Sequence, residues 1–476
     1  MLMKINKNLK RIAAKNKYLY SIYRFAYNFY QNIREEEKAR NEFNYRFRYS
    51  KPLIENYVDT SLKPELNVII IVIDCLRYRN VSFAGYNRKT TPFLDSFRTK
   101  FKAISAAPYT YPSVPSILTG LYPHNHGAYI SGKVRNFDVL ENIKPLRRNI
   151  LTLPEILFAL GYDIYFATSI DMARYPLRSR IISKIYAPRT SAQKILKDTK
   201  KWIFKRKKPF FAYLHLGDIH GPLDPPHNFR DFFGEVKNLP NIEKWSFRKI
   251  EEQKGKEFQE YKENRILLYD NTLRYVDYSI EKFYSHLKDQ GVMDSTIVVV
   301  TADHGEEFWE HAKLETENFY DPRGYYGVGH GHNLFNEIIE VPLLFSGPKI
   351  PKKKFDNIVS TVDIMPTLLD LLEIDHKLYL DGNNVFKNKD NRILLSEAVG
   401  YGYEKKALVG NRYKLLYSKN DDVQWVFDLK KDPEEQLPIK DKEIISSFLS
   451  RLQKIVERDE KMRVKEIIKR KFKYKY

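Results

Sequence analysis

The sequence predicts an α/β protein in which a large central mixed β-sheet lies between helices and a small antiparallel subdomain follows. Three continuous apolar runs, Asn67–Ile73, 209–216 and Thr296–Thr301, are typical of strands that are buried on both faces. Helical patterns separate these runs, and strands that alternate with helices indicate a mainly parallel sheet. From about Asp381 onward, short strand-like pieces alternate with turns, as in a small antiparallel sheet.

These patterns divide the chain into four segments. Residues 1–60 form a basic, aromatic N-terminal arm that we expect to be helical, 61–380 the α/β body, 381–440 the small antiparallel subdomain and 441–476 a basic C-terminal helix. The further elements expected in the body are a helix at 154–161, a strand at 164–167, a helix at 260–286, a strand at 342–345 and a helix at 364–372. Short strands of the subdomain are expected at 392–396, 407–409, 413–417 and 425–428.

Composition excludes several classes of protein. Of the 476 residues, 43% are hydrophobic and 14% are aromatic, so the chain can bury a sizeable core and wholesale disorder is excluded. The single cysteine excludes a disulfide framework and any multi-cysteine zinc or iron–sulfur site, and it fits a reducing compartment.

The net charge of +21 is concentrated at the two ends of the chain. Residues 1–50 hold 12 basic and 4 acidic side chains, and residues 451–476 hold 11 basic and 4 acidic ones. Basic ends attract polyanions such as anionic membrane surfaces and acidic glycans, and we do not expect nucleic acid as a partner. Tyr23, Tyr27 and Tyr30 fall at helical spacing, which leaves two interpretations open: a helix docked on the body, or a helix on a membrane surface.

No segment has the pattern of a membrane span or a signal peptide. The longest clean apolar run is 68–73, far short of the roughly 20 residues that a transmembrane helix needs. The basic N-terminus is not followed by an apolar stretch with a small-residue cleavage site. We therefore expect a cytoplasmic protein, with peripheral attachment to a membrane as the alternative.

Polar side chains gather at the ends of three of the predicted strands. In an open α/β sheet, ligands bind outside the carboxyl ends of the strands, so we expect these side chains to meet. Carboxylates and imidazoles are ligands for divalent metal ions, and three such strand ends together predict one metal site. The residues are Asp74 after the first strand, His215, Asp218 and His220 at the end of the second, and Asp303, His304 and Glu306 after the third.

Between these strand ends lies the segment APYTYPSVPSILTGLYPHNHG, which resembles the signature of the sulfatase family in the alkaline phosphatase superfamily. That signature runs Cys/Ser-x-Pro-x-Arg, followed by Leu-Thr-Gly and Pro-His. Counting back from Leu118-Thr119-Gly120 puts Thr110 at the position of the nucleophile. Other segments resemble the family in the same order over 67–440: NVIIIVIDCLR, TTPFLDSF, LPEILFALGYDIYFAT, PFFAYLHLGDIHGPLDPP, DSTIVVVTADHGE, GHGHNLFNEIIEVPLLFSGP, STVDIMPTLLDLLEI and VFDLKKDPEEQ.

The chain departs from this signature at two positions that decide the chemistry. Thr110 stands where a sulfatase carries the Cys or Ser that becomes formylglycine, and Val114 stands where the signature has Arg. The only cysteine, Cys75, lies beside Asp74, and ATSIDMARY replaces a Gly-Lys-Trp-His motif of the family. A formylglycine hydrate sheds sulfate by collapsing to the aldehyde, whereas a Thr ester has no such exit; a Thr phosphate can instead be attacked at phosphorus. The chain therefore resembles the Thr-nucleophile, non-formylglycine members, and we favour phosphoryl over sulfuryl chemistry.

The resemblance implies the residues of the metal site and the nucleophile. Asp74, Asp303 and His304 would bind a divalent ion, with Thr110 as the fourth ligand and the covalent nucleophile. Calcium, manganese, magnesium and zinc all remain candidates, because the ligand set mixes carboxylate and imidazole donors.

The resemblance also implies residues that handle the substrate. His330 stands at a substrate or acid/base position, His332 two places on is its alternative, and His220 is the other candidate for protonating the leaving oxygen. Arg77 would hold the anionic group or pair with a nearby carboxylate. One ion is expected, and a second would be held by Asp218 and His220 together with His330 or His332.

The implied function is that of a metal-dependent hydrolase that cleaves a phosphate, phosphodiester or sulfate ester through a covalent Thr110 intermediate. The substrate would be an anionic ester, linked to a glycan or a lipid. Three alternatives stay open: a phosphoryl-headgroup transferase that uses an alcohol acceptor, a sulfuric ester hydrolase, and a non-catalytic surface-binding protein on the same scaffold.

Overall fold

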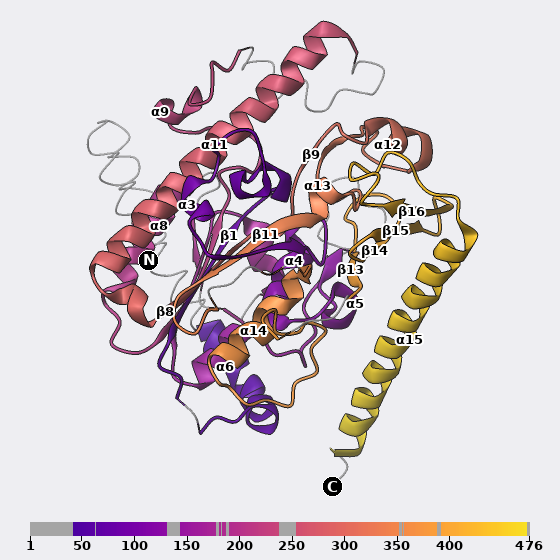
Figure 1. The fold of residues 1–476 in the computed structure, drawn as a ribbon. Coiled ribbons are helices and arrows are strands. Elements are labelled where there is room, and N and C mark those ends of the chain that lie inside the picture. The colour runs from indigo at the N-terminus through magenta and orange to yellow at the C-terminus, as the bar shows by residue number, and fades with distance from the viewer. Residues whose placement is uncertain are drawn as a thin grey trace, which may run out of the picture.

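The computed structural model of this protein describes residues 41–61, 63–130, 143–177, 180–181, 183–186, 190–237, 254–351, 355, 357–387 and 392–473. The α/β prediction is confirmed, because a mixed eight-stranded sheet lies between helices (Figure 1). The strand order is β12-β2-β11-β8-β1-β7-β5-β6. The bounds are β1 (Asn67–Ile73), β2 (Thr99–Ile104), β5 (Asp163–Thr168), β6 (Ser183–Ile185), β7 (Phe210–Leu216), β8 (Thr296–Thr301), β11 (Glu340–Ser346) and β12 (Val359–Ser360).

Helices cover both faces of this sheet (Figure 1). On one side lie α3 (Pro92–Asp95), α8 (Ala192–Ile203) and the long helix α11 (Gly255–Asp289). On the other side lie α4 (Thr110–Thr119), α6 (Leu153–Ala159) and α14 (Ile364–Leu371). The shorter helices are α5 (Pro123–His126), α7 (Asp171–Arg174), α9 (His227–Arg230), α12 (Ala312–Asn318) and α13 (Asn336–Ile339).

The three central strands fix the position of the site. β1 pairs in parallel with β7 on one side and with β8 on the other. All three strands are mostly apolar and almost entirely buried. Val72 of β1 lies level with His215 of β7 and with Thr301 of β8. The residues that follow these positions therefore leave the sheet at the same edge, as the sequence predicts.

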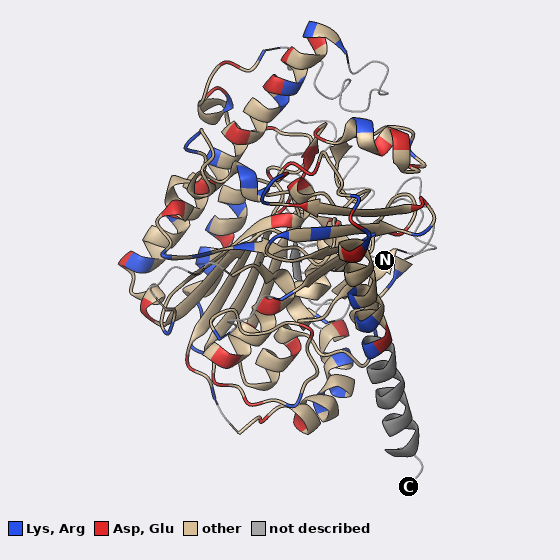
Figure 2. Ribbon diagram, turned by 45° about the vertical axis from the view of Figure 1, so that its right-hand side comes forward, with Lys and Arg blue, Asp and Glu red and all other residues tan. Residues whose placement is uncertain are grey.

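A separate small antiparallel sheet follows the body, as predicted. It consists of β13 (Leu394–Glu397), β14 (Lys406–Val409), β15 (Tyr413–Ser418) and β16 (Val423–Asp428). Helix α15 (Lys442–Lys473) packs Phe448 and Leu452 against this sheet and then extends away from the body (Figure 1). Figure 2 shows basic and acidic residues interspersed along the described helices. Among the described helices, none combines the length and the hydropathy that a membrane span requires.

The described part of the N-terminal arm is docked on the body. Residues 41–57 are helical, and the rings of Phe43 and Phe47 meet Phe158 of α6 edge-on, with centroid distances of 4.9 and 4.8 Å. Buried aromatic pairs of this kind stabilise packing by about 0.5–1.5 kcal/mol beyond their buried area. The tyrosine stripe of residues 23–30 lies outside the described residues, so the membrane interpretation of that stripe stays a prediction.

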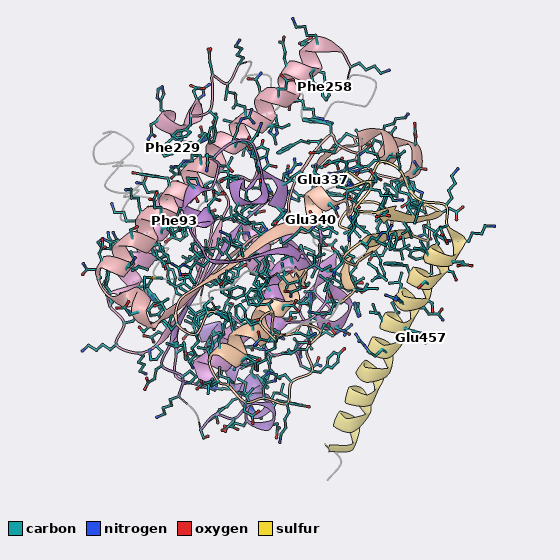
Figure 3. The ribbon with its side chains drawn as sticks, in the orientation of Figure 1. Phe93, Phe229, Phe258, Glu337, Glu340 and Glu457 are labelled. Atoms are coloured by element: carbon teal, nitrogen blue, oxygen red, sulfur yellow. The ribbon has the colours of Figure 1, made fainter. Side chains whose placement is uncertain are left out.

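A buried polar network joins the body to the small sheet. His311 donates from Nδ1 to Glu337 Oε1 at 2.5 Å and from Nε2 to the carbonyl of Glu434 at 2.9 Å. Lys414 of β15 is fully buried and contacts Glu435 Oε1 at 2.6 Å. Figure 3 shows Glu337 between the large sheet and the small one. Buried charges that are paired in this way tie the two sheets together.

Candidate active site

Three buried ligand atoms converge at the carboxyl ends of β1, β7 and β8. They are Asp74 Oδ2, Asp303 Oδ2 and His215 Nε2, and all three side chains are fully buried. His215 Nε2 lies 3.4 Å from Asp74 Oδ2 and 3.6 Å from Asp303 Oδ2, and none of these atoms has a hydrogen-bond partner among the described residues. Two neighbouring buried carboxylate oxygens without partners are unfavourable unless a cation joins them, so this donor set fits a divalent metal ion.

His304 completes the cluster from the segment after β8. Its Nδ1 donates to the carbonyl of Gly305 at 2.8 Å, which leaves the Nε2 lone pair of the neutral ring facing the carboxylates. That Nε2 lies 3.3 Å from Asp74 Oδ1 and 3.4 Å from Asp303 Oδ2. A ring held in this tautomer by a backbone carbonyl is the usual arrangement of a metal-binding histidine.

The electrostatics of the two carboxylates differ. Burial raises the pKa of Asp303, and the neighbouring Asp74 carboxylate raises it further. Burial also acts to raise the pKa of Asp74, but the imidazoles of His215, His220 and His304 outweigh it and lower that pKa. The cluster therefore keeps Asp74 ionised and disfavours ionisation of Asp303. Such a difference is expected at a site where a cation would balance the second negative charge.

Thr110 begins helix α4 beside this cluster. Tyr109 is the extended N-cap residue, and all ten residues of the helix are buried up to Gly120, whose positive φ of 66° ends it. Thr110 Oγ1 lies 3.2 Å from His304 Nε2, so the hydroxyl donates to the free lone pair of that ring. The N-terminus of a helix favours negative charge, so an anion that forms on Thr110 is stabilised there.

Two half-buried histidines line the outer side of the cluster. His330 donates from Nδ1 to Glu306 Oε2 at 2.6 Å, and its ring lies 4.3 Å from that of His304. His220 donates from Nδ1 to the carbonyl of Gly221 at 2.8 Å, and its ring lies 5.2 Å from that of His330. Burial acts to raise the pKa of Glu306, but His330 outweighs it, so that this pKa falls to about 2 and the carboxylate stays ionised.

Three other candidates have different partners. Both carboxylate oxygens of Asp218 accept the backbone N–H of Ala192, the first residue of α8, at 3.0 and 2.9 Å. His332 Nε2 contacts Glu307 at 3.0 Å and Glu315 at 3.2 Å. Arg77 forms an ion pair with Glu310 and stacks 4.7 Å from the ring centroid of Phe308. The structure thus brings the predicted metal ligands together with Thr110, His220 and His330, and it engages the other three elsewhere.

The sequence analysis counted His215 among the strand-end side chains of the expected metal site but did not include it in the set of four ligands. Its signal was an imidazole in the otherwise apolar strand PFFAYLHL. Cys75 is a second addition, because its Sγ lies 3.2 Å from Asp74 Oδ1 and 3.7 Å from His330 Nδ1. Its left-handed backbone, with φ of 62°, is strained for a residue other than glycine, as is common at functional sites.

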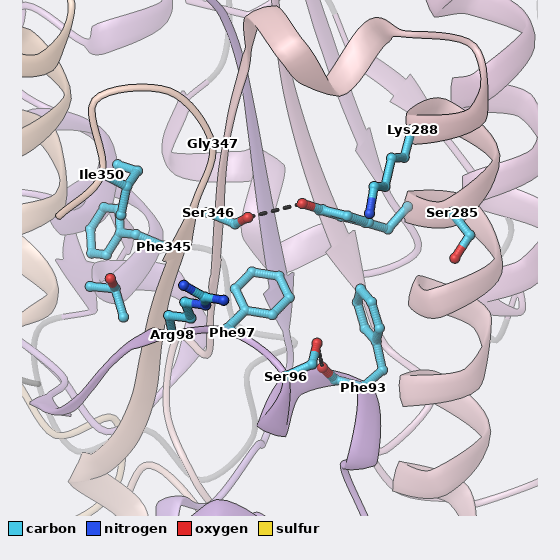
Figure 4. A pocket seen from close by; sticks show the side chains of 12 residues that line it. Phe93, Ser96, Phe97, Arg98, Ser285, Lys288, Phe345, Ser346, Gly347 and Ile350 are labelled. Atoms are coloured by element: carbon cyan, nitrogen blue, oxygen red, sulfur yellow. Dashed lines mark hydrogen bonds between the residues drawn. The ribbon is translucent and has the colours of Figure 1, made fainter. Parts of the chain in front are cut away.

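A separate cavity of about 490 Å³ opens at the other edge of the sheet (Figure 4). Its wall includes Phe93, Phe97 and Tyr284, with Arg98 and Lys288 at the rim. No Asp, Glu, His or Cys is among the described residues that line it, so it offers no donor set for a metal ion.

Two family models match this chain. The sulfatase model matches residues 66–374, and the model of the C-terminal region of N-sulphoglucosamine sulphohydrolase matches residues 324–462. An arylsulfatase of Clostridium perfringens is 26% identical over 265 residues, which are 52% of this chain and 53% of the relative. The low-salt glycan biosynthesis sulfotransferase Agl7 of Haloferax volcanii is 25% identical over 316 residues, which are 65% of this chain and 62% of the relative. The chain thus matches less than two thirds of the length of either.

Solved structures share the fold at low sequence identity. A putative sulfatase from Bacteroides thetaiotaomicron is 20% identical with a TM-score of 0.63, and the alignment covers 84% of this chain and 93% of that one. The phosphonate monoester hydrolase of Agrobacterium radiobacter is 16% identical with a TM-score of 0.62, covering 83% and 95%. A protein solved with its substrate D-glucosamine-2-N,6-O-disulfate is 17% identical with a TM-score of 0.59, covering 83% and 98%. On the match of the family model to 66–374, the chain belongs to the sulfatase family.

Proposed function

We propose that this chain is a metal-dependent hydrolase that cleaves a sulfate or phosphate ester through a covalent intermediate on Thr110. One observation carries the proposal. The Thr110 hydroxyl lies at a helix N-terminus, 3.2 Å from His304 Nε2, beside the convergent and unpartnered atoms of Asp74, Asp303 and His215. This arrangement combines an activated hydroxyl with a cation site, as nucleophilic transfer of an anionic group requires.

The proposed reaction has two displacement steps. Asp74, Asp303, His215 and His304 would hold a divalent ion, which would supply positive charge to lower the pKa of the Thr110 hydroxyl and to offset the charge of the ester oxygens. The Thr110 hydroxyl gives its proton to solvent, Oγ1 forms a bond to sulfur or phosphorus while the bond to the leaving oxygen breaks, and the leaving oxygen takes up a proton. Water then attacks the same atom, the bond to Oγ1 breaks, and the hydroxyl of Thr110 is restored.

Two histidines are placed to move the protons of these steps. His330 donates from Nδ1 to the Glu306 carboxylate, which fixes the orientation of its ring beside the site, where it can exchange a proton with the leaving oxygen. His220 keeps its Nε2 available because Nδ1 donates to the Gly221 carbonyl. We assign His330 as the general acid and His220 as a donor or acceptor to the transferred group.

The donor set also narrows the choice of ion. His215 and His304 supply two imidazoles beside two carboxylates, and such sites favour Mn²⁺ or Zn²⁺ over Ca²⁺, which prefers oxygen ligands. One ion is proposed at this set. For a second ion, Cys75 replaces Asp218 as the partner of His220 and His330, since those three ligand atoms lie within 4.8 Å of one another.

The choice between sulfate and phosphate depends on how the Thr110 ester is released. The family and the relatives described above favour a sulfate ester, since one similar protein is named for glycan biosynthesis and another was solved with a sulfated sugar. The chemistry of a threonine ester favours phosphate, because attack at phosphorus is its direct route of release. We propose that the substrate is such an anionic ester on a sugar.

Paired p-nitrophenyl esters test the proposal. The purified full-length protein is incubated with sulfate, phosphate, phosphodiester and phosphonate esters in the presence of Mn²⁺, Zn²⁺, Mg²⁺ or Ca²⁺, and release of p-nitrophenol is measured. Intact mass spectrometry of the quenched enzyme detects an added sulfuryl or phosphoryl group on the peptide that contains Thr110. Metal-dependent turnover that survives in a Thr110→Ala variant contradicts the proposed nucleophile.

A transferase is the second candidate. Agl7 is named as a sulfotransferase, and a threonine ester can pass its group to an alcohol as readily as to water. Adding a sugar alcohol to the turnover assay distinguishes the two functions. A transferase forms the sulfated or phosphorylated acceptor in proportion to acceptor concentration, whereas a hydrolase releases inorganic sulfate or phosphate. The non-catalytic alternative predicts no turnover with any ester, together with intact metal binding.

A further inference from the structure

Arg265 of helix α11 is a buried cation without a counterion in the part of the chain that the structure describes. Arg265 is only 7% exposed, and its Nε atom is buried without a hydrogen-bond partner. Arg77 and Arg180, which are similarly buried, each contact a carboxylate, from Glu310 and Glu155 respectively. Buried charges are normally paired, so an unpaired guanidinium points to a ligand.

The guanidinium of Arg265 lies next to the proposed active site. A Cβ atom placed on Gly221 would be 3.1 Å from Arg265 Nη2, so the missing side chain of Gly221 leaves room for it. Gly221 follows His220, whose ring lies 5.2 Å from that of His330, and His330 lies 4.3 Å from His304. Arg265 Nη2 therefore lies beside Gly221, the residue that follows His220.

The acidic group that Arg265 influences, Glu306, already has a hydrogen-bond partner. Glu306 accepts the Nδ1–H of His330 at 2.6 Å. Arg265 contributes to the low pKa of Glu306 through its charge, after burial and the effect of His330, so the two groups share one polar region. They form no ion pair within 4.0 Å, and the donors of Arg265 stay available.

We propose that Arg265 binds a second anionic group of the substrate, beyond the sulfate or phosphate that reacts at Thr110. This inference rests on the proposed function and names its substrate class: an ester that also carries a carboxylate, sulfate or phosphate on the same or the adjacent sugar. A guanidinium offers a planar fork of donors that matches such an oxyanion. Along the contacts given above, His304, His330 and His220 separate Thr110 from the segment that Arg265 meets, so we assign Arg265 to a group other than the one that reacts.

Binding of matched sugar esters to the metal-loaded protein tests the inference. The first pair is D-glucosamine 6-O-sulfate and D-glucosamine-2-N,6-O-disulfate, and the second is glucose 6-phosphate and glucose 1,6-bisphosphate. Isothermal titration calorimetry with the Thr110→Ala protein gives affinities without turnover. We expect the doubly substituted sugar of at least one pair to bind more tightly. Arg265→Met should weaken its binding by about 10- to 100-fold, with little change for the singly substituted sugar.

Two further variants control for structural effects. Arg274→Met removes a cation of the same helix that is already paired with Asp277, and it should leave both affinities unchanged. Arg265→Lys keeps the charge but loses the fork, so it should recover part of the preference. If Arg265→Met does not fold, Arg265→Lys alone decides between the two roles. A purely structural role predicts that the lysine variant prefers the doubly substituted sugar as strongly as the parent does, whereas the proposed role predicts a weaker preference.

Three results would overturn the inference. An equal loss for both sugars of a pair would place Arg265 at the reacting group. No loss of affinity for either sugar would make Arg265 a structural residue. If the singly substituted sugar binds as tightly as the doubly substituted one, or more tightly, in both pairs, no second anion is recognised. The proposed function can fail separately. If the protein prefers the doubly substituted sugar but hydrolyses no ester, the inference about Arg265 stands and the hydrolase function is wrong.

Discussion

Replacing Asp303 by asparagine should have opposite effects on the stability of the metal-free and metal-loaded protein. Asp303 and Asp74 are both fully buried, and their outer oxygens have no hydrogen-bond partner among the described residues. Asparagine has the same shape, but it removes one of the two charges that a metal ion would neutralise. Without metal the variant should therefore be more stable than the parent, and with metal it should be less stable.

The structure sets the size of both effects. Ligand atoms of the two carboxylates lie within 4.8 Å of each other. At an effective dielectric constant of about 20, two unit charges 4.8 Å apart repel by about 3.5 kcal/mol, and the two imidazoles offset part of this repulsion. A chain of this length unfolds with an entropy of about 1 kcal/mol per kelvin, so the metal-free variant should melt up to about 3 °C higher.

Metal binding should shift the melting temperature of the parent by a similar amount. An ion present at about 100 to 1,000 times its Kd stabilises the folded state by about 2.7 to 4.1 kcal/mol, or about 3 to 4 °C here. The Asp303→Asn variant should show little of this shift. Differential scanning fluorimetry of the full-length protein, with EDTA and with a titration of Mn²⁺ or Zn²⁺, measures all four melting temperatures.

A matched control is Asp218→Asn, which changes a half-buried carboxylate at a neighbouring strand end. Because Asp218 accepts the Ala192 N–H at the start of α8, its replacement should lower the melting temperature with and without metal. The metal-induced shift itself should stay as in the parent. A full metal-induced shift in Asp303→Asn, or a metal-free variant that melts below the parent, would refute the assignment of this cluster as the metal site.

Thr110→Ala should lower turnover of any accepted ester by at least about 1,000-fold while metal binding, measured by calorimetry, persists; unchanged turnover rules out the nucleophile. The free energy of unfolding, measured by urea titration, should fall between pH 7 and 10. Burial and the Glu315 carboxylate both raise the pKa of Glu307. Burial acts to lower the pKa of His332, but the Glu315 carboxylate outweighs it and raises that pKa to about 10. Both folded-state values lie above the unfolded ones, so rising pH removes protons that the folded state binds more tightly, and Glu307→Gln should flatten the curve. Lys414→Met should destabilise the protein by about 3–5 kcal/mol because it leaves Glu435 charged and unpaired; adding Glu435→Gln should recover part of this in chemical denaturation, and no recovery contradicts the pairing. Finally, the basic ends should bind vesicles with anionic headgroups at low salt and release them at high salt in co-sedimentation, and equal binding to neutral vesicles argues against a membrane role.

The fold could be predicted because its central strands are buried on both faces. Strands such as β1 and β8 consist of β-branched runs that have no other common explanation. β2 was missed, since its sequence TKFKAI alternates lysines with buried residues and therefore lacks a continuous apolar run. Strand β12 has two residues, too few for any periodicity to appear.

The candidate site was less predictable, because spacing in the sequence does not show which way a polar side chain turns. Asp218 and His220 stand in the same short motif after β7, but Asp218 turns to the N-terminus of α8 while His220 faces His330. His215 lies inside the strand, and only the register of β7 against β1 brings it beside Asp74.

Arg265 lay still further beyond sequence reasoning. In KENRILLYDN it has the pattern of an ordinary polar position on an amphipathic helix, and helical periodicity predicts burial without predicting partners. Val114 leaves the chain without the arginine of the sulfatase signature, and Arg77 is engaged by Glu310. In our proposal Arg265 does not replace these two groups at the reacting ester, but binds a second anion of the substrate. Helix α11 lies on the opposite side of the sheet to α4, so Arg265 and the nucleophile approach the site from different layers.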